Sequence, residues 1–413
     1  MSETAPVVIV GAGHGGVQVA ASLREEGYDG KIVLLSAEPH LPYQRPPLSK
    51  AFLKREIGAD ALPLRGEAFY TQRGIDLLLG EEARSIDPGR RRLHLASGAT
   101  LSYRHLVLAT GGRQRLLPLE GAGLDGVLTL RSLADAERLR ERLDRAERVA
   151  VIGAGFIGLE FAAVAAGRGL KVHILELGER PMGRAVSPVV SDFYTRAYHA
   201  LGADIRFGTS VVSLEGDAGK VTRLRLASGE RLPVDLVLVG IGMLPCAELA
   251  AAAGLACPDG IEVDEAMSTA DTAISAIGDC ALHPNVFAGR RLRLESVQNA
   301  VDQARVVAKR VCGRPARYTA VPWFWSDQGD LRLQIAGLVH GADKLVLRGA
   351  SNEGGFSVFA FADGCLLGVE SINRPGDHMA ARRLLGGNIP IRPEEASDPQ
   401  FDLKARVMSS SAR

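Results

Sequence analysis

Cysteine is scarce in this sequence and comes late in the chain. There are five cysteines among 413 residues, and no two of them form a C-x-x-C pair. Their scatter argues against a dithiol redox pair, a zinc ribbon or an iron–sulfur cluster, so we expect no metal site. Buried or incidental thiols are the better interpretation. The five are Cys246, Cys257, Cys280, Cys312 and Cys365.

Net charge and long apolar runs are also lacking. The 49 Lys and Arg residues against 48 Asp and Glu give a net charge of +1, with no overall attraction to nucleic acid or membrane. No apolar run approaches the roughly 18–20 residues that span a bilayer. The first residues, MSETAPVVIVGAG, lack the features of a signal peptide. The composition indicates a soluble, cytoplasmic enzyme of about two to three domains.

The strongest positive feature is an internal sequence repeat. Residues 7–16 read VVIVGAGHGG and residues 149–158 read VAVIGAGFIG. Each is an apolar run followed by G-x-G-x-x-G and an Ala- and Leu-rich helical stretch, and a second apolar run comes after it (KIVLLS and KVHILE). This order predicts two βαβ units with parallel strands, each able to bind a dinucleotide.

The glycines have the same physical purpose in both units. The first (Gly11, Gly153) allows a tight turn, and the second (Gly13, Gly155) lets the backbone approach a pyrophosphate at the positive end of the following helix. The third (Gly16, Gly158) lets the helix pack closely on the strand. The candidate contacts of the two loops are therefore Gly11, Gly13, His14, Gly15 and Gly16, and Gly153, Gly155, Phe156, Ile157 and Gly158.

An acidic residue distinguishes the second unit. Glu176 ends the strand in HILELGER, where a carboxylate can accept hydrogen bonds from an adenosine ribose and repels a 2′-phosphate. This favours NADH over NADPH. Arg180 and Arg184 leave the choice open, because an arginine can accommodate that phosphate. In the first unit Glu38 comes a few residues late, and an exposed loop glutamate is an equal alternative.

Other segments define the fold class. The strands YRHLVLATGG (103–112) and VDLVLVGIGM (234–243) mark where the chain passes between the two nucleotide domains. ISAIGDCA (274–281) is a strand whose end carries an Asp, and an amphipathic helix follows at 295–313. From about residue 320 the pattern alternates, with hairpin turns at Gly354-Gly355 and Asp363-Gly364, and the tail from about 398 is expected to be frayed.

We therefore expect an α/β protein with two Rossmann-like nucleotide-binding domains and a C-terminal α+β domain that contains an antiparallel sheet. The expected boundaries are 1–112 with 245–320 for the first nucleotide domain, 113–244 for the second and 321–413 for the C-terminal domain.

Over its whole length the sequence resembles the FAD-dependent, NADH-dependent ferredoxin reductases that serve bacterial cytochromes P450 and aromatic-ring dioxygenases. Their fold is that of the glutathione reductase superfamily. The resemblance rests on motifs occurring together and in order: GAGHGG, QRPPLSK (44–50), LATGG, GAGFIGLE, AIGDCA, ESVQNAVDQA and PWFWSDQ (322–328). It implies FAD on the first glycine loop and NADH on the second.

The resemblance also implies roles for single residues. Lys50 would lie beside the flavin, paired with Glu160, and the helix that opens at Ser296 and Val297 would direct its positive end to the flavin pyrimidine. The FAD contacts implied outside the glycine loop are Ala37, Arg45, Lys50, Ala83, Arg131, Gly278, Asp279, Ser296, Val297 and Trp325, and the further NADH contacts are Arg184 and Gly242. The alternatives are a helix N-cap for Asp279, solvent-exposed Lys50 and Glu160, and a core position for Trp325.

One absence separates this chain from related enzymes. The related disulfide reductases carry a C-x-x-x-x-C pair after the first βαβ unit, and NADH peroxidases carry one cysteine there. No cysteine precedes Cys246 in this chain. Reduced FAD would therefore release its electrons directly, as single electrons to a [2Fe–2S] ferredoxin.

Such ferredoxins are acidic, so we expect a basic docking surface. Arg305, Lys309 and Arg310 give one candidate at helical spacing, and the alternative is an ordinary solvated face. Two rival functions remain open. One is an NADH oxidase or rubredoxin reductase of the same fold, and the other is a redox-responsive interaction protein like the apoptosis-inducing factors.

Overall fold

The computed structural model describes residues 5–351 and 354–411. By its internal contacts the chain divides into two compact units, each assembled from segments distant in sequence. Unit 1 comprises Met1–Gln44, Asp60–Arg113 and Leu244–Pro322, and unit 2 comprises Arg45–Ala59, Gln114–Met243 and Trp323–Arg413. Each unit has its own hydrophobic core.

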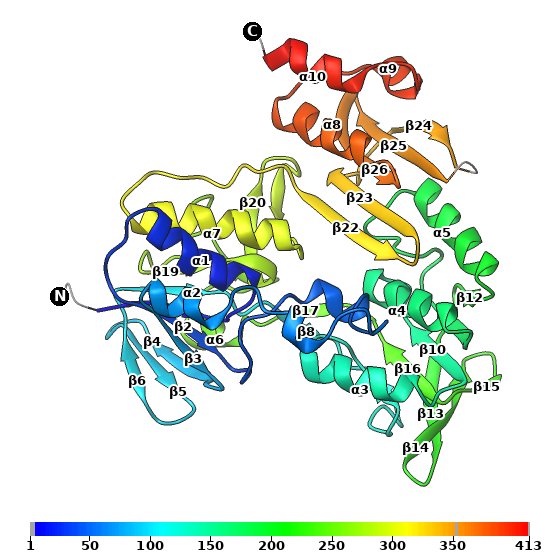
Figure 1. The fold of residues 1–413 in the computed structure, drawn as a ribbon, viewed down its shortest axis with the longest axis horizontal. Coiled ribbons are helices and arrows are strands. Elements are labelled where there is room, and N and C mark those ends of the chain that lie inside the picture. The colour runs from blue at the N-terminus through cyan, green and yellow to red at the C-terminus, as the bar shows by residue number, and fades with distance from the viewer. Residues whose placement is uncertain (1–4, 352–353, 412–413) are drawn as a thin grey trace. The chain divides into compact units, whose positions relative to one another are not determined.

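Unit 1 is built on a five-stranded parallel sheet (Figure 1). Its central strand has the sequence VVIV and is buried along its whole length, as expected for parallel strands covered on both faces. In spatial order the strands are β19 (Ile274–Ala276), β7 (His105–Leu108), β1 (Val7–Val10), β2 (Ile32–Ser36) and β3 (Ile75–Leu79). Because all run in one direction, the loops after β1, β2, β7 and β19 meet at one edge of the sheet.

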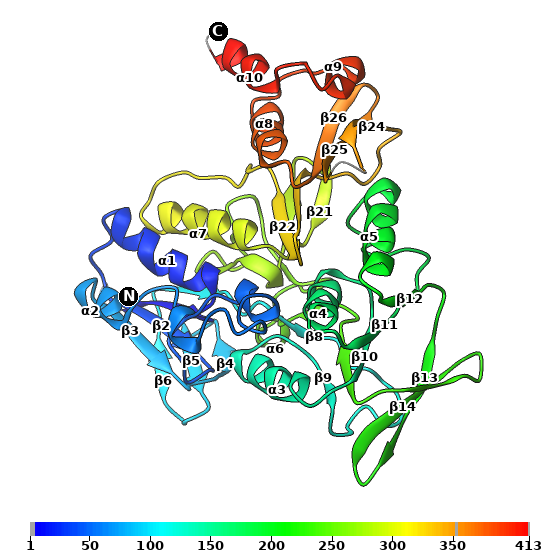
Figure 2. The same cartoon turned by 45° about the vertical axis from the view of Figure 1, so that its right-hand side comes forward.

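Two long helices pack against each other in this unit, α1 (His14–Glu25) and α7 (Val297–Val311) (Figures 1 and 2). The buried residues of α1 have small or aliphatic side chains, including Ala20 and Leu23. The amphipathic helix expected at 295–313 corresponds to α7, which buries Ala304, Val307 and their neighbours and exposes the opposite face.

Unit 1 also contains two small sheets and two short helices. Strands β4, β5 and β6 form an antiparallel sheet, and in the other sheet β20 pairs in parallel with β18 and antiparallel with β21. Helix α2 precedes β4, and α6 lies between β6 and β18 in the sequence. Their bounds are β4 (Ala83–Asp87), β5 (Arg92–Leu95), β6 (Thr100–Ser102), β18 (Ile261–Glu262), β20 (Ala281–Asn285), β21 (Arg290–Leu292), α2 (Glu67–Gln72) and α6 (Glu248–Ala252).

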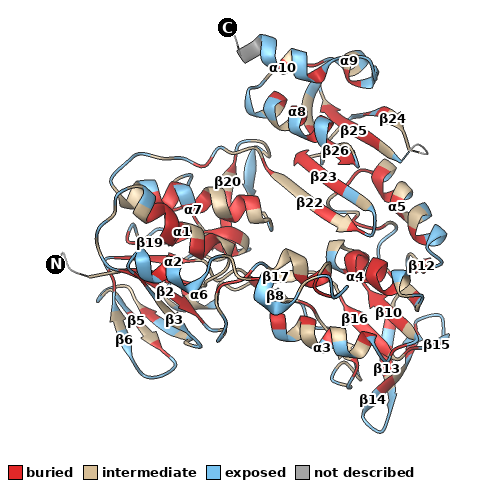
Figure 3. Ribbon diagram, in the orientation of Figure 1, coloured by how far each residue is buried: buried red, intermediate tan, exposed pale blue. Residues whose placement is uncertain are grey.

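Unit 2 repeats the parallel architecture. Its sheet runs β12 (Asp204–Arg206), β11 (Lys171–Leu175), β10 (Arg148–Ile152), β16 (Leu236–Val239) and β9 (Val127–Leu128), all parallel. Figure 3 shows α4 (Phe156–Gly167) as largely buried. The remaining elements are α3 (Leu133–Leu143), α5 (Pro188–Ala200) and the antiparallel strands β13 (Val211–Asp217), β14 (Lys220–Leu226) and β15 (Arg231–Pro233).

The expected antiparallel sheet of the C-terminal segment is present in unit 2. Its order is β22 (Trp323–Gln328), β23 (Leu331–Gly337), β26 (Cys365–Ile372), β25 (Gly355–Ala362) and β24 (Lys344–Ala350). The turn at Asp363-Gly364 joins β25 to β26, and both residues have positive φ (48° and 75°), as two-residue hairpin turns require. The turn at Gly354-Gly355 borders residues 352–353, which lie outside the described residues, and Gly355 begins β25.

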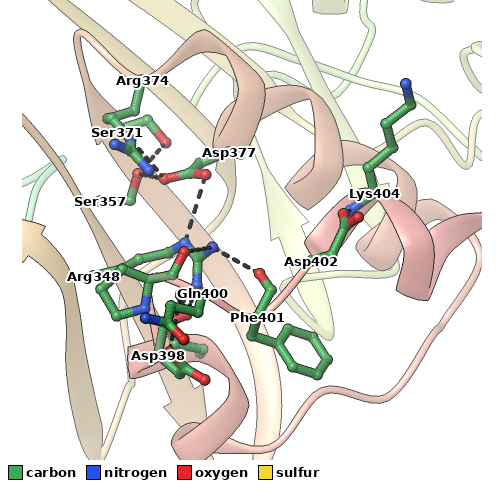
Figure 4. A network of polar contacts seen from close by, with 12 residues as sticks. Arg348, Ser357, Ser371, Arg374, Asp377, Asp398, Gln400, Phe401, Asp402 and Lys404 are labelled. Atoms are coloured by element: carbon green, nitrogen blue, oxygen red, sulfur yellow. Dashed lines mark hydrogen bonds and ion pairs between the residues drawn. The ribbon is translucent and has the colours of Figure 1, made fainter.

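The expectation of a frayed tail from about 398 is wrong for the described residues. Helix α8 (Pro375–Gly386) is followed by α9 (Pro393–Ser397) and α10 (Leu403–Ser411). The buried guanidinium of Arg348 donates to the carbonyl oxygens of Asp398 and Phe401, the latter at 2.8 Å, and its Nε lies 3.6 Å from Asp377 (Figure 4). An arginine fixed by several backbone carbonyls is a tertiary contact that local sequence does not reveal.

None of the helices in the two described ranges combines the length and the apolar character that a membrane crossing requires.

Candidate dinucleotide-binding sites

The glycine loop of unit 1 connects β1 to α1. Gly11 has φ 103°, and a Cβ there would lie 2.2 Å from the carbonyl oxygen of Ala109. A Cβ on Gly16 would lie 1.9 Å from the carbonyl oxygen of Gly11. Backbone atoms cannot yield at such distances, so the fold itself requires glycine at both positions.

The loop of unit 2, between β10 and α4, has the same geometry. Gly153 has φ 102°, and a Cβ would lie 2.5 Å from the Gly240 carbonyl oxygen. A Cβ on Gly158 would lie 2.3 Å from the Gly153 carbonyl oxygen. The repeated sequence motif therefore forms a loop of the same geometry in both units.

The middle glycine of each loop differs from its neighbours. Gly13 and Gly155 have φ of −78° and −80°, which any residue can adopt. A Cβ on Gly13 would meet no described atom within 4 Å, and one on Gly155 would meet only the Gly240 carbonyl oxygen, at 3.9 Å. The fold does not need glycine here, so the open space fits the close approach of a ligand pyrophosphate.

Each of these two glycines is also the N-cap of the following helix. In the described structure neither N-cap position supplies a side-chain hydrogen bond to the first helical amides. Those amides and the helix dipole suit an anion such as a pyrophosphate. Nearby, His14 begins α1, and Gly15 packs under Ile277, with 3.1 Å between its added Cβ and Ile277 Cδ1. In the second loop, Ile157 is 43% exposed and Phe156 packs on Phe324, with ring centroids 4.5 Å apart.

Glu176 lies where the sequence predicts, directly after β11. Its Oε2 accepts a hydrogen bond from the Ala154 amide at 2.7 Å, and its Oε1 accepts one from the Gly178 amide at 2.7 Å. The carboxylate is thereby fixed against the second glycine loop. This is where the ribose of a dinucleotide on that loop would lie.

The two arginines that follow Glu176 have different surroundings. Arg180 donates to the carbonyl oxygens of Gly183 and Val186 and to the Ser191 hydroxyl, all at 2.7–2.8 Å, so it fixes the turn before α5. Arg184 is exposed, and one of its terminal nitrogens lies 3.4 Å from the Cβ position of Gly242. Only Arg184 of the two retains a guanidinium that a 2′-phosphate could reach.

The other candidate FAD contacts of unit 1 lie where its strands and helices begin or end. Asp279 is the middle residue of a 3₁₀ turn at Gly278–Cys280, directly after β19, and not a helix N-cap. Ser296 is the N-cap of α7, and its Oγ accepts from the Asn299 amide at 3.1 Å. Ala37 follows β2, Ala83 begins β4 and Val297 begins α7.

A buried polar network in unit 1 links two of these positions and was not predicted. The side chain of Gln303 accepts from the Gly278 amide at 2.7 Å and donates to Asn299 Oδ1 at 3.0 Å. Its amide nitrogen lies 3.2 Å from Nδ1 of His283. Burial lowers the pKa of His283 to about 4, so this imidazole is neutral near pH 7. Gln303 therefore ties the turn at Gly278 to the first turn of α7.

The ion pair expected from the motifs is present in unit 2. Lys50 Nζ lies 2.7 Å from Glu160 Oε1, with 17% and 2% of the two side chains exposed. Glu160 also accepts from the hydroxyls of Ser49 and Ser326, the latter at 2.6 Å. The alternative of solvent-exposed side chains is excluded. Neither serine was predicted. The alternation of side chains along WFWSDQ does place Ser326 on the same face of the strand as Phe324.

Three further candidate FAD contacts belong to unit 2. Arg45 donates to the carbonyl oxygen of Arg131 at 2.7 Å. Trp325 is partly exposed, unlike a core tryptophan, and its ring centroid lies 5.7 Å from that of Trp323. The roles of Arg45, Arg131 and Trp325 as FAD contacts stay predictions.

The basic surface expected on α7 needs a correction. Arg305 and Lys309 are exposed, and Arg305 pairs with Asp302 at 2.6 Å. Arg310 instead turns toward the sheet, where it donates to the Ser275 hydroxyl and lies 3.3 Å from His105 Nε2. Helical spacing alone could not reveal this, because the partners of Arg310 come from β7 and β19.

Two βαβ units with paired glycine loops and a carboxylate after the second define an oxidoreductase that handles two dinucleotides. Residues 5–304 match the model of the pyridine nucleotide-disulphide oxidoreductases, and residues 323–407 match the reductase C-terminal domain. The chain belongs to the pyridine nucleotide-disulphide oxidoreductase family.

Near-full-length similarity extends to individual proteins. Rhodocoxin reductase of Rhodococcus erythropolis is 46% identical over 97% of this chain and 94% of its own length. A rubredoxin-NAD(+) reductase of Pseudomonas putida is 42% identical over 93% of this chain and 99% of its own. The crystal structure of the ferredoxin reductase for the CYP199A2 system of Rhodopseudomonas palustris superposes with a TM-score of 0.95 at 48% identity, covering 97% of this chain and 99% of that one.

Proposed function

We propose that this chain is an NADH-dependent flavoprotein reductase that passes single electrons to a [2Fe–2S] ferredoxin serving a cytochrome P450 or another oxygenase. The observation that carries the proposal is the pair of matched glycine loops at residues 11–16 and 153–158, called here the first and second cradle. Each has a middle glycine that the fold does not require. The named activities of the similar proteins, rhodocoxin reductase and a ferredoxin reductase, agree with it.

The second cradle is assigned to NADH. The amides at the start of α4, after Gly155, receive the pyrophosphate, and Glu176 accepts from the adenosine ribose. The negative charge of Glu176 disfavours a 2′-phosphate. Phe156, Ile157, Arg184 and Gly242 border the same ligand.

The first cradle is assigned to FAD. When bound, FAD accepts a hydride from NADH and releases two electrons one at a time. Gly13 and the start of α1 would hold its pyrophosphate, and Asp279 would accept hydrogen bonds from its hydroxyl groups. The positive end of α7, capped by Ser296, would stabilise negative charge on the pyrimidine ring of the flavin. Lys50 and Glu160 hold a fixed pair of charges where the nicotinamide reacts.

The lack of a thiol relay supports direct electron transfer to the partner. All five cysteines follow residue 245, and the described ones are free thiols. The docking surface for an acidic ferredoxin is placed on the exposed face of α7, with Arg305 and Lys309. We also propose a cytoplasmic location and three domains, with boundaries at 1–112 with 245–320, 113–244 and 321–413.

One observation favours a second acceptor: a similar protein is named a rubredoxin reductase. Steady-state assays of the FAD-loaded enzyme with NADH and one acceptor at a time distinguish the two. We expect a [2Fe–2S] ferredoxin to be reduced at least about tenfold faster than rubredoxin, with oxygen alone slower still. Faster turnover with rubredoxin would make it the acceptor, and turnover with oxygen alone equal to that with either protein would refute the proposal.

A further inference from the structure

The carboxylate of Glu160 is held by more than its lysine partner. Its Oε1 lies 2.7 Å from Lys50 Nζ and accepts from the Ser326 hydroxyl at 2.6 Å, while Oε2 accepts from the Ser49 hydroxyl. Glu160 is 3% exposed and Ser326 is fully buried. Ser49 precedes Lys50 in the chain, whereas Ser326 belongs to β22 of the C-terminal sheet. Two segments remote from α4 therefore fix this carboxylate.

The hydrogen bonds of Ser326 continue to two further buried side chains, Gln328 and Tyr198. Nε2 of Gln328 donates to Ser326 Oγ at 3.3 Å, and Oε1 of Gln328 lies 3.0 Å from the Tyr198 hydroxyl. That hydroxyl donates to the carbonyl oxygen of Leu159 at 2.5 Å. The single hydroxyl hydrogen of Tyr198 thus faces two acceptors, Gln328 Oε1 and the carbonyl oxygen of Leu159, and Leu159 is the neighbour of Glu160 on α4. Gln328 and Tyr198 are 2% and 1% exposed, which shields these bonds from water.

Gln328 also reaches the second glycine loop. Its Nε2 lies 3.6 Å from the sulfur of Met182. The Met182 amide donates to the Ala154 carbonyl oxygen at 2.9 Å, and the Ala154 amide donates to Glu176. Met182 has φ 52°, a conformation that a non-glycine residue adopts only when its surroundings enforce it. Strand β22 thus contacts Glu160 directly through Ser326 and is linked to the loop assigned to NADH through Gln328 and Met182.

We propose that Ser326 and Gln328 are positioning residues for hydride transfer, and that through them the C-terminal sheet sets the orientation of the Glu160 carboxylate. This inference rests on the proposed function, because it assumes that the Lys50–Glu160 pair acts where nicotinamide reacts. A carboxylate with three donors has one favoured orientation. Without the Ser326 hydroxyl, Glu160 can rotate with Lys50, and misplacement by a fraction of an ångström slows a positioned reaction.

The test is the anaerobic reduction of the bound flavin by NADH, followed by stopped-flow absorbance over a range of NADH concentrations. For Ser326→Ala we expect the limiting rate constant to fall about tenfold, while the NADH dissociation constant changes less than about twofold. Ser357→Ala is the matched control, because Ser357 is equally buried in the same sheet but bonds Ser371 and Asp377 (Figure 4). It should leave both constants unchanged.

Two more variants keep the outcomes separate. Gln328→Met keeps the length of the side chain but removes the amide, and a fall of about threefold in the limiting rate is expected even if Ser326→Ala does not fold. Lys50→Met tests the pair itself. If Lys50→Met slows flavin reduction and both Ser326→Ala and Gln328→Met do not, the inference falls and the proposed function stands. If Lys50→Met also leaves the rate unchanged, the role of the pair falls, and the inference with it.

Discussion

The Glu176 carboxylate accepts a hydrogen bond from the amide of Ala154 at 2.7 Å. The acidic residue that follows β11 thus touches the glycine loop that follows β10. The parallel register brings them together, because Ile152 lies opposite Leu175. Two signals 22 residues apart in sequence are thereby brought into contact, as our assignment of a ribose and a pyrophosphate to this loop requires.

Removing the charge of Glu176 should relax the choice between NADH and NADPH. For Glu176→Ser we expect the ratio of kcat/KM for NADH to that for NADPH to fall about tenfold, because the carboxylate no longer repels a 2′-phosphate. Glu179→Ser, in the same exposed loop, is the control and should leave the ratio unchanged. An unchanged ratio in Glu176→Ser would mean that the ribose lies elsewhere.

Adding one methyl group to each cradle in turn should show which ligand each of them binds. Gly13→Ala and Gly155→Ala both have room for a Cβ in the protein, so both variants should fold. We expect Gly13→Ala to lose most of its FAD during purification, and Gly155→Ala to retain FAD while its KM for NADH rises about tenfold. Flavin absorbance and NADH saturation curves measure the two effects, and the opposite pattern would exchange the ligand assignments.

Ferredoxin binding should depend on the exposed charges of α7. For the double variant Arg305→Glu and Lys309→Glu we expect the ferredoxin KM to rise about tenfold and its salt dependence to weaken, because an acidic partner is then repelled. Flavin reduction by NADH should not change. Lys220→Glu, at the exposed first position of β14, is the control. A ferredoxin KM equal to that of the control would place the docking surface elsewhere.

Glu370 should make stability depend on pH. It is buried in β26, where its Oε1 accepts from the Ser187 amide at 2.8 Å, and burial raises its pKa from 4.5 to about 7. Between these two values the folded state holds a proton that the unfolded state has released. The contribution of Glu370 to the free energy of unfolding is therefore greatest below about pH 4.5 and is lost as the pH rises through about 7. The total loss is about 3 kcal/mol.

The variant Glu370→Gln isolates this effect, since a glutamine resembles the protonated acid and does not titrate. Its free energy of unfolding should change less than that of the wild type between about pH 5 and pH 8, by up to about 3 kcal/mol. Denaturant titration at several pH values measures this. Parallel pH profiles for wild type and variant would show that Glu370 is not the responsible group.

The sequence was most informative where a residue type is required by the backbone or by a ligand. The glycines of both loops and Glu176 follow from motifs whose spacing fixes their geometry, whereas the Lys50–Glu160 pair was implied by the family resemblance and not by spacing. The donors around Glu160 did not follow, because Ser326 is 166 residues from it and only the packing of β22 on α4 joins them.

The two errors have the same cause. Arg310 was assigned to a surface from helical spacing, but it is turned inward by Ser275 and His105 on neighbouring strands. The tail was expected to fray, but the described part is fixed by carbonyl contacts to Arg348 and by the ion pair between Arg406 and Glu395. Local sequence does not record which distant groups satisfy a charge.

We propose that electrons pass from NADH through FAD directly to a ferredoxin. An anaerobic titration tests this transfer: the FAD-loaded enzyme, after its thiols are alkylated, is mixed with NADH and an excess of [2Fe–2S] ferredoxin. We expect two ferredoxins to be reduced for each NADH oxidised, at the rate of the unmodified enzyme. Flavin reduction without any ferredoxin reduction, or loss of the transfer on alkylation, would contradict it.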